Sequence, residues 1–120
     1  MNGSIRKKEI FSPDRLIHEP ARLQIVSYLA ARGTYVAFTE LKENLGLTAG
    51  NLSVQLKKLE EAGYVEIKKS FRERRPLTRV FLTRQGMTAL RQYLAELEKM
   101  IERLKNDTAP AVDSKGEKAT

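Results

Sequence analysis

The chain has 120 residues, of which 41% are hydrophobic, and this is enough for one compact core in a single domain. Lysine and arginine number 22 against 15 acidic residues, so the net charge of +7 favours a polyanionic partner, although basic charge alone is common among small proteins. Because the chain has no cysteine and only one histidine, we expect no disulfide, no metal site and no cofactor.

Residues 1–12 are interpreted as a basic N-terminal arm, of which residues 1–8 are polar and expected to be loose. This segment lacks the long apolar core of a signal peptide, and no stretch of the sequence reaches the length of a membrane span. We therefore expect a cytoplasmic protein with no membrane partner. The apolar residues that follow indicate that the next part of the chain is anchored in the fold: Ile10, Phe11, Leu16 and Ile17. His18, the single histidine, is expected to cap or to pack beside Pro20 rather than to sense pH.

Two helices are predicted in the first half of the chain. The first begins near Pro20, a residue favoured in a first turn, and ends at Gly33. Residues 34–36 are compatible with a very short strand, and the second helix is expected to run from an N-cap at Thr39 to Gly46. Apolar residues recur at helical spacing in both helices: Leu23, Val26, Leu29 and Ala30 in the first, and Phe38, Leu41 and Leu45 in the second.

A third helix is predicted over residues 49–62, capped by Thr48 and closed by Gly63. Leu52, Leu56 and Leu59 lie on one face of it, in the pattern typical of burial. Two short helices joined by a tight glycine-containing turn are typical of a helix-turn-helix, in which the second helix reads the major groove. The predicted major-groove residues are Thr48, Gly50, Asn51, Ser53, Val54, Lys57 and Lys58.

A two-stranded wing is predicted to follow. A valine-rich strand (YVEI, residues 64–67) leads into a basic turn over residues 68–79, and a strand (VFL, residues 80–82) returns with Val80 and Leu82 inward. Cations gathered at a hairpin tip repel one another, so we expect DNA phosphates to compensate them; a merely solubilising loop is the alternative. The predicted wing contacts are Lys68, Lys69, Arg72, Arg74, Arg75 and Arg79.

The last helix is predicted over residues 83–105, capped by Thr83. Its apolar stripe steps by three and four residues and is longer than a small domain can bury, so we expect it to pair with a second copy; a purely internal core is the alternative. Residues 106–120 are small, polar and non-periodic, and a disordered tail is expected there. The predicted dimer interface comprises Leu90, Tyr93, Leu94, Leu97, Met100, Ile101 and Leu104.

From residue 16 to residue 103 the sequence resembles the compact MarR-like winged-helix transcriptional regulators, and more distantly the ArsR group. The resemblance rests on the segments LIHEPARLQIVSYL, FTELKENLGLTAGNLSVQLKKLEEAGYVE and RPLTRVFLTRQG, in that order. It implies a mainly α fold with a small β-wing (α+β), a winged helix-turn-helix over residues 13–105 with a long C-terminal dimerisation helix. The chain lacks the cysteines and histidine clusters of the metal-sensing branch, and it is shorter than typical ligand-responsive members, so a small-molecule effector stays open.

Together these patterns predict a sequence-specific regulator of transcription that binds double-stranded DNA. We expect a homodimeric repressor that occupies a pseudo-palindromic operator through the helix over 48–62 and the wing over 68–79. Asn51 would pair with adenine, Val54 would touch a thymine methyl, and Arg74 or Arg75 would enter the minor groove. The alternative is a winged-helix module that docks onto proteins. An enzyme is not expected, because no nucleophile and base of the usual kind can be assembled from these residues.

Overall fold

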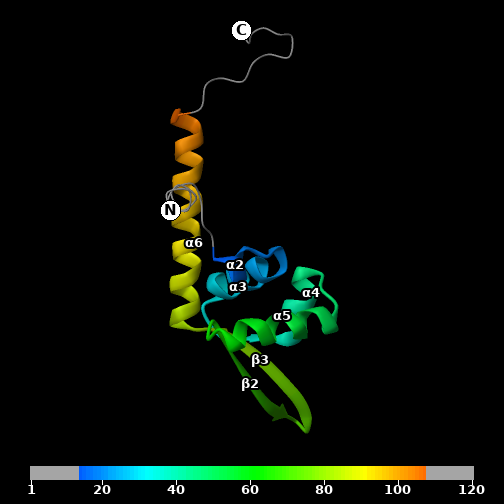
Figure 1. The fold of residues 1–120 in the computed structure, drawn as a ribbon. Helices are drawn as coiled ribbons and strands as arrows, with labels where there is room; N and C mark the ends of the chain where they lie inside the picture. The colour runs from blue at the N-terminus through cyan, green and yellow to red at the C-terminus, as the bar shows by residue number, and fades with distance from the viewer. Residues whose placement is uncertain (1–13, 108–120) are drawn as a thin grey trace, which may run out of the picture. The chain divides into compact units, whose positions relative to one another are not determined.

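The computed structural model describes residues 14–107 of the chain (Figure 1). The elements follow one another as α2 (Arg15–His18), α3 (Pro20–Arg32), β1 (Val36–Ala37), α4 (Phe38–Leu45), α5 (Ala49–Glu61), β2 (Val65–Arg72), β3 (Arg75–Leu82) and α6 (Arg84–Asp107). The described residues up to Leu94 belong to one compact unit, and the distal part of α6 from Ala95 belongs to another. The expected mainly α fold with a small antiparallel sheet is confirmed.

The helices of the compact unit begin and end largely where the sequence predicts. Pro20 opens α3, and Gly33 ends it with a φ of 68°, a left-handed conformation that glycine adopts without strain. Thr48 caps α5 as predicted, because its hydroxyl accepts a hydrogen bond of 3.0 Å from the backbone N–H of Asn51. The short helix α2 was not predicted; Asp14 caps it by accepting from the N–H of Leu16 at 2.9 Å.

The predicted cap at Thr39 is wrong. Helix α4 begins at Phe38, so its N-cap is Ala37, two residues before Thr39, and Ala37 makes no side-chain hydrogen bond. The reason is that Ala37 also ends β1, which pairs with β3 and delivers the chain directly into the helix. Strand pairing thus fixes the start of α4, and no capping side chain is needed there. The strand itself lies at 36–37 rather than at the predicted 34–36.

The three strands form an antiparallel sheet in the order β1-β3-β2. The predicted basic turn over 68–79 is wrong in extent, because β2 and β3 remain paired as far as Arg72 and Arg75. Only Glu73 and Arg74 connect them, with φ values of 51° and 69°. Positive φ at both central residues is what a two-residue type I′ hairpin turn requires. The far end of this hairpin projects beyond the helices (Figure 1).

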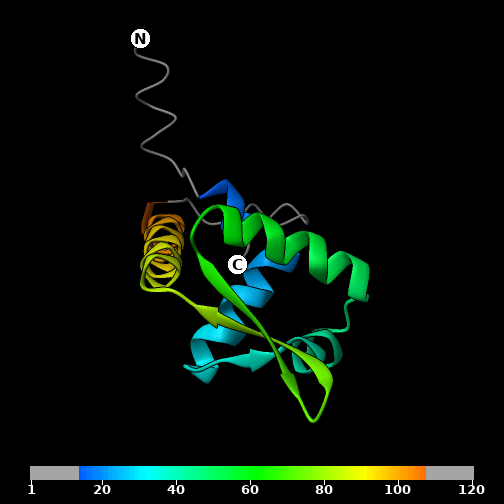
Figure 2. The same cartoon turned by 90° about the horizontal axis from the view of Figure 1, so that it is seen from below.

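The hydrophobic core lies between the helices and the sheet. Helices α3, α4 and α5 pack on one another and on the strands (Figure 2). The apolar faces that the sequence predicts are buried: the cluster contains Ile25, Val26, Leu29, Val36, Leu41, Leu52, Leu56, Leu59, Val65, Val80, Leu82 and Leu90. Each such side chain contributes about 1.5–3 kcal/mol of hydrophobic stabilisation relative to exposure, which fixes the surface on which α5 is held.

Helix α6 begins after Thr83, whose hydroxyl accepts a hydrogen bond of 3.0 Å from the N–H of Gly86, so this predicted cap is confirmed. The helix continues to Asp107, two residues beyond the predicted end, so Asn106 and Asp107 are helical. The rest of the predicted tail and the whole predicted arm over 1–12 lie outside the described residues. Between residues 14 and 107, no helix is both long and apolar enough to cross a membrane.

Candidate nucleic-acid interface

The outer face of α5 is open to solvent along its whole length. All seven predicted major-groove residues are exposed: Thr48, Gly50, Asn51, Ser53, Val54, Lys57 and Lys58. Val54 is half exposed, although it is apolar. The opposite face carries the buried Leu52, Leu56 and Leu59, which hold the helix on the core. The first turn therefore presents short side chains outward on a fixed support, which is the arrangement that close approach to base edges needs.

A hydrogen-bonded series links this outer face to α3. The guanidinium of Arg22 donates from Nη1 to Oε1 of Gln55 at 2.7 Å. Gln55 in turn donates from Nε2 to Oδ1 of Asn51 at 3.0 Å. Arg22 is itself held by a hydrogen bond of 2.7 Å from its Nε to the carbonyl of Leu16. Sequence reasoning missed both Arg22 and Gln55, because they are 33 residues apart and only the tertiary fold brings them together.

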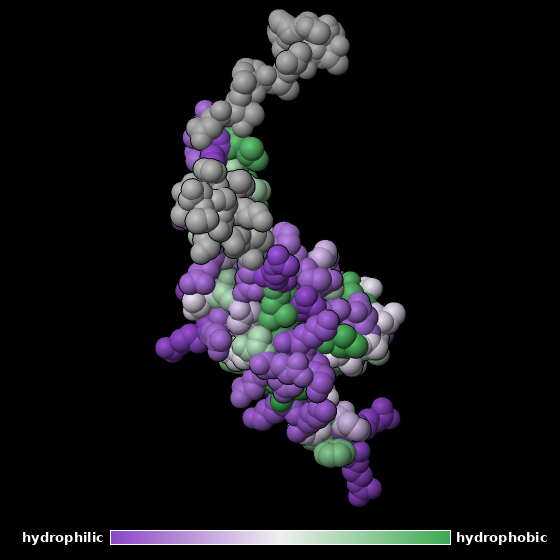
Figure 3. Space-filling view, in the orientation of Figure 1, coloured by the Kyte–Doolittle hydropathy of each residue, from purple (hydrophilic) through white to green (hydrophobic). Residues whose placement is uncertain are grey.

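The cations of the wing lie on both faces of the hairpin rather than in one cluster at its tip. Residues opposite one another in an antiparallel pair share a face. Lys68 is opposite Arg79, and Arg72 is opposite Arg75, so these four lie on one face. Lys69 lies on the other face, opposite Thr78, and Arg74 is in the turn. The prediction of a single basic tip is corrected to a hairpin with cations on both faces, and its surface is mainly hydrophilic (Figure 3).

The base of the hairpin is an aromatic and cationic cluster around Tyr35. The Arg79 guanidinium and the Lys68 ammonium lie 5.4 Å and 5.5 Å from the centroid of the Tyr35 ring. The Tyr35 hydroxyl donates to Glu66 at 3.1 Å, and desolvation followed by this carboxylate raises the pKa of Tyr35. Arg79 is half-buried, so it packs at the base of the wing, whereas the other five predicted wing cations are exposed.

Phe71, near the tip, is the most exposed of the large hydrophobic side chains in the described part of the chain, at 74%. It lies on the same face as Lys69, opposite Pro76. Sequence reasoning assigned it no role. The sequence did contain a signal for its exposure, since Phe71 is an aromatic residue within a basic run. The outer end of a two-stranded hairpin has no core in which such a side chain could be buried.

An open groove of about 380 Å³ lies between α5 and the hairpin. Lys57 from the helix and Lys69 from the strand both line it, together with Ser53, Leu56 and Ile67. Helix α5 and one face of the hairpin thus border the same hollow, and each supplies a lysine to it. Within residues 14–107 no group of acidic or histidine side chains is arranged to hold a metal ion.

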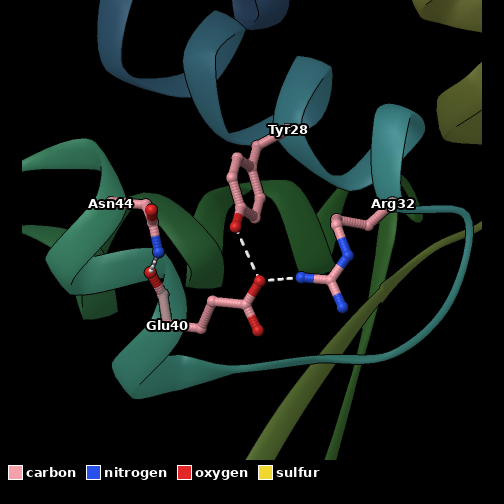
Figure 4. Close-up of polar contacts among 4 residues, drawn as sticks. All are labelled: Tyr28, Arg32, Glu40 and Asn44. Atoms are coloured by element: carbon pink, nitrogen blue, oxygen red, sulfur yellow. Dashed lines mark hydrogen bonds and ion pairs between the residues drawn. The ribbon is translucent and has the colours of Figure 1, made fainter.

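The first helix of the helix-turn-helix, α4, is tied to α3 through Glu40 (Figure 4). Its carboxylate accepts a hydrogen bond of 2.6 Å from the hydroxyl of Tyr28 and forms an ion pair with Arg32. Its backbone carbonyl accepts from the side chain of Asn44 at 2.9 Å. One acidic residue in the first turn of α4 thereby holds two residues of α3, and this fixes how α4 is placed before the turn into α5.

The predicted dimer residues fall into two groups. Leu90 and Tyr93 are only 5% and 6% exposed, because they pack within the compact unit of the same chain. Tyr93 also contacts His18, whose Nδ1 lies 3.1 Å from the tyrosine hydroxyl, whereas packing of His18 beside Pro20 stays a prediction. The other group faces outward along α6: Leu94, Ile101 and Leu104 are 45%, 43% and 57% exposed, and Leu97 and Met100 are half-buried.

Comparison with known proteins agrees with this geometry. A family model described as a winged helix DNA-binding domain matches residues 21–101. The chain belongs to this family. It is 40% identical over 83 residues to an uncharacterized protein of Methanocaldococcus jannaschii, a match that covers 69% of this chain and 89% of the relative.

Solved structures of winged helix proteins resemble this one. A transcriptional regulator homologue from Pyrococcus horikoshii is 32% identical with a TM-score of 0.71, and the match covers 76% of this chain and 89% of that one. A MarR-like transcriptional regulator from Thermotoga maritima shares the fold with a TM-score of 0.58 at 21% identity, over 90% of this chain and 77% of that one. The winged helix fold expected from the resemblance to MarR-like regulators is therefore confirmed.

Proposed function

We propose that this winged helix protein is a sequence-specific, double-stranded DNA-binding regulator of transcription that acts as a homodimer. The observation that carries the proposal is the pairing of two exposed surfaces in one compact unit: the leading face of α5 and the projecting cationic hairpin. In this arrangement α5 enters the major groove, and the hairpin reaches the neighbouring backbone and minor groove. Residues 13–105 would then comprise the DNA-binding and dimerisation unit.

The electrostatics of the hairpin support a polyanionic partner. Lys68, Lys69, Arg72, Arg74 and Arg75 are exposed. Among residues 14–107, none of them has a carboxylate within ion-pair distance. Glu73 is the only acidic residue at the turn. Like charges along a slender hairpin repel one another unless a partner neutralises them, and the phosphates of a duplex supply the opposite charge.

Arg74 occupies a costly position for its residue type. Its φ of 69° is left-handed, a conformation that side chains other than glycine, asparagine and aspartate rarely adopt. A two-residue turn of this kind favours Asn-Gly, yet this chain has Glu73 and Arg74 there. Strain of this kind is found at functional sites, and an arginine at the tip is suited to a narrow minor groove.

The outward stripe of α6 supports the homodimer. Leu94, Ile101 and Leu104 would remain in water in a single chain, at a cost that burial against a second copy removes. The dimer contact is therefore proposed for Leu94, Leu97, Met100, Ile101 and Leu104, without Leu90 and Tyr93. Two α5 helices related by a two-fold axis would read the half-sites of a pseudo-palindrome, and occupation of a promoter would repress it.

The proposed DNA partner also determines what we expect for the localisation of the protein and for catalysis. A protein that acts by occupying genomic DNA is expected in the cytoplasm and needs no catalytic step, so we do not propose an enzyme. Its exposed carboxylates Glu60 and Glu61 lie on a solvated face of α5. The second candidate, a winged helix that docks onto a protein, would leave the cations of the hairpin without a matching partner.

The experiment is a titration of the protein against labelled duplex DNA at two salt concentrations. The variant Arg72→Gln/Arg75→Gln should bind all duplexes more weakly and with a salt slope smaller by about 1.8, because each lost phosphate contact removes about 0.9 from the slope. The matched control is Arg15→Gln/Arg91→Gln, which removes the same charge from exposed positions outside α5 and the hairpin. Equal slopes in the two variants would refute the wing contact, and no saturable binding by the unchanged protein would favour the protein-docking alternative.

A further inference from the structure

Asn51 lies at the exposed leading end of α5, and its side chain is not free to turn. It is the last member of the series that runs from Arg22 through Gln55, with bonds of 2.7 Å and 3.0 Å. Arg22 is anchored independently, since its Nε donates to the Leu16 carbonyl and its backbone N–H donates to the carboxylate of Glu19. The series therefore connects a fixed point in α3 to a residue on the proposed DNA-reading face.

The polarity of the series is determined by its first member. A guanidinium has five N–H donors and no acceptor, so Gln55 must turn its carbonyl oxygen toward Arg22. The amide nitrogen of Gln55 then faces Asn51, and a donor there requires that Asn51 present its own oxygen to Gln55. Each amide is thus held in one of its two orientations, and the NH₂ group of Asn51 is the end left for solvent or DNA.

We propose that Arg22 and Gln55 are positioning residues that make Asn51 a hydrogen-bond donor toward the major groove, so that it selects a base with an acceptor on its groove edge. This inference rests on the proposed DNA binding. Guanine offers N7 and O6, adenine N7 and thymine O4, whereas cytosine offers only its N4 donor. The base that Asn51 faces is therefore a purine or thymine, and cytosine is excluded from that position.

This polarity also makes the bidentate contact of Asn51 with adenine, predicted from the sequence, less favourable than a contact through the Asn51 NH₂ group alone. A bidentate contact with adenine uses both the oxygen and the nitrogen of an asparagine. Here Gln55 already donates to one of the two lone pairs of Asn51 Oδ1. Asn51 therefore has two free N–H donors and only one free acceptor lone pair for a contact with a base. Without the hydrogen bonds from Arg22 through Gln55, the Asn51 amide would rotate freely and could present either its oxygen or its NH₂ group to the groove. The preference of the protein among the four bases at this position would then be lost.

The decisive variant is Gln55→Glu. A carboxylate accepts from Arg22 as before but can only accept from Asn51, so the asparagine must reverse and turn its oxygen to the groove. Selection of bound fragments from random duplex DNA, followed by competition with four duplexes that differ at the selected position, measures the preference. The unchanged protein should disfavour cytosine by about tenfold, and Gln55→Glu should favour cytosine or adenine there by a similar factor.

Two further variants separate positioning from stability. Arg22→Gln can either donate or accept, so the preference at this position should fall to within about twofold while preferences elsewhere in the site persist. Gln24→Glu, the same chemical change at an exposed position of α3, should leave the preference at every position unchanged. Because the readout is a ratio between duplexes, a uniform loss of affinity from the added negative charge cancels.

The outcomes distinguish this inference from the proposed function. Unchanged preference at the tested base in both Gln55→Glu and Arg22→Gln, with the unchanged protein binding selectively, would overturn the positioning role alone. Absence of saturable duplex binding by the unchanged protein would overturn the proposed function. A shift of preference in Gln24→Glu equal to that in Gln55→Glu would also overturn the inference, because the effect would then follow charge rather than polarity.

Discussion

Replacing Gly86 with alanine should strongly destabilise the compact unit, although alanine is the better helix former. Gly86 lies in the first turn of α6, where the helix passes the start of β2. An added Cβ would lie 2.3 Å from the backbone oxygen of Tyr64 and 2.6 Å from Cδ1 of Leu82. The Tyr64 oxygen also accepts a hydrogen bond of 3.0 Å from the Thr83 N–H, so it cannot withdraw without breaking the junction between β2 and α6.

The magnitude follows from two opposing effects. Helix propensity favours alanine over glycine by up to about 1 kcal/mol. Against it stand overpacking, typically about 1–3 kcal/mol, and a weakened backbone hydrogen bond, about 1 kcal/mol. We expect a net loss of about 2 kcal/mol, which for a unit of this size lowers the melting temperature by roughly 8–16 °C.

The matched control is Gly50→Ala in α5, where an added Cβ would meet nothing within 4 Å. This variant should gain about 0.5–1 kcal/mol, since only the propensity difference remains. Both variants are measured by thermal and urea unfolding followed by circular dichroism. A Gly86→Ala protein as stable as the unchanged chain would refute the close approach of α6 to β2 on which the reasoning depends.

Three further predictions concern single interactions. Tyr64→Phe should lower the free energy of unfolding by about 1 kcal/mol at neutral pH, because the tyrosine hydroxyl donates a hydrogen bond of 2.6 Å to the Asp14 carboxylate. The pKa of Tyr64 is raised from 10.0 to about 12, so this stabilisation is present below pH 10 and is lost as the pH rises toward 12. Urea unfolding from about pH 8 to about pH 12 should therefore show a steeper decline of stability in the unchanged chain than in the variant. Glu40→Ala should lower the free energy of unfolding by about 1–2 kcal/mol, because the contacts of Glu40 with Tyr28 and Arg32 are lost. Glu43 is exposed on the same helix, so the control Glu43→Ala should change that free energy by less than about 0.5 kcal/mol. Similar losses for both variants in urea titrations would contradict the stabilising contact between α3 and α4. The variant Glu73→Asn/Arg74→Gly keeps the net charge and should raise the free energy of unfolding by about 0.5–1 kcal/mol, because Asn-Gly suits the positive φ values of this turn. It should also weaken duplex binding roughly tenfold in a gel-shift titration. Unchanged affinity would show that Arg74 does not contact DNA.

The helices and the burial of their faces were predictable from the sequence because apolar periodicity is strong there. Leu52, Leu56 and Leu59 are all in the core, and the cap at Thr48 lies where the side-chain chemistry predicts. The extent of the hairpin was not predictable in the same way. Its outer half has water on both faces, so no alternation of apolar and polar residues marks β2 beyond Ile67.

The candidate site was predictable as a surface and not as a set of contacts. Exposure of the outer face of α5 follows from the burial of the inner face. The link from Arg22 through Gln55 to Asn51 does not, because it depends on the packing of α3 against α5. The apolar stripe of α6 shows the same limit: a continuous stripe in the sequence does not reveal that Leu90 packs in the chain's own core while Leu104 is left exposed.

We expect two copies of the chain to bind one duplex through paired α5 helices and hairpins. Sedimentation equilibrium of the protein, alone and with a duplex selected from random DNA, gives both the state of assembly and the stoichiometry. The expected result is a dimer in both samples and two chains per duplex, on a selected sequence whose inverted half-sites are centred about 10 base pairs apart or a multiple of it. A monomer that shows no saturable association with double-stranded DNA at low salt would contradict it.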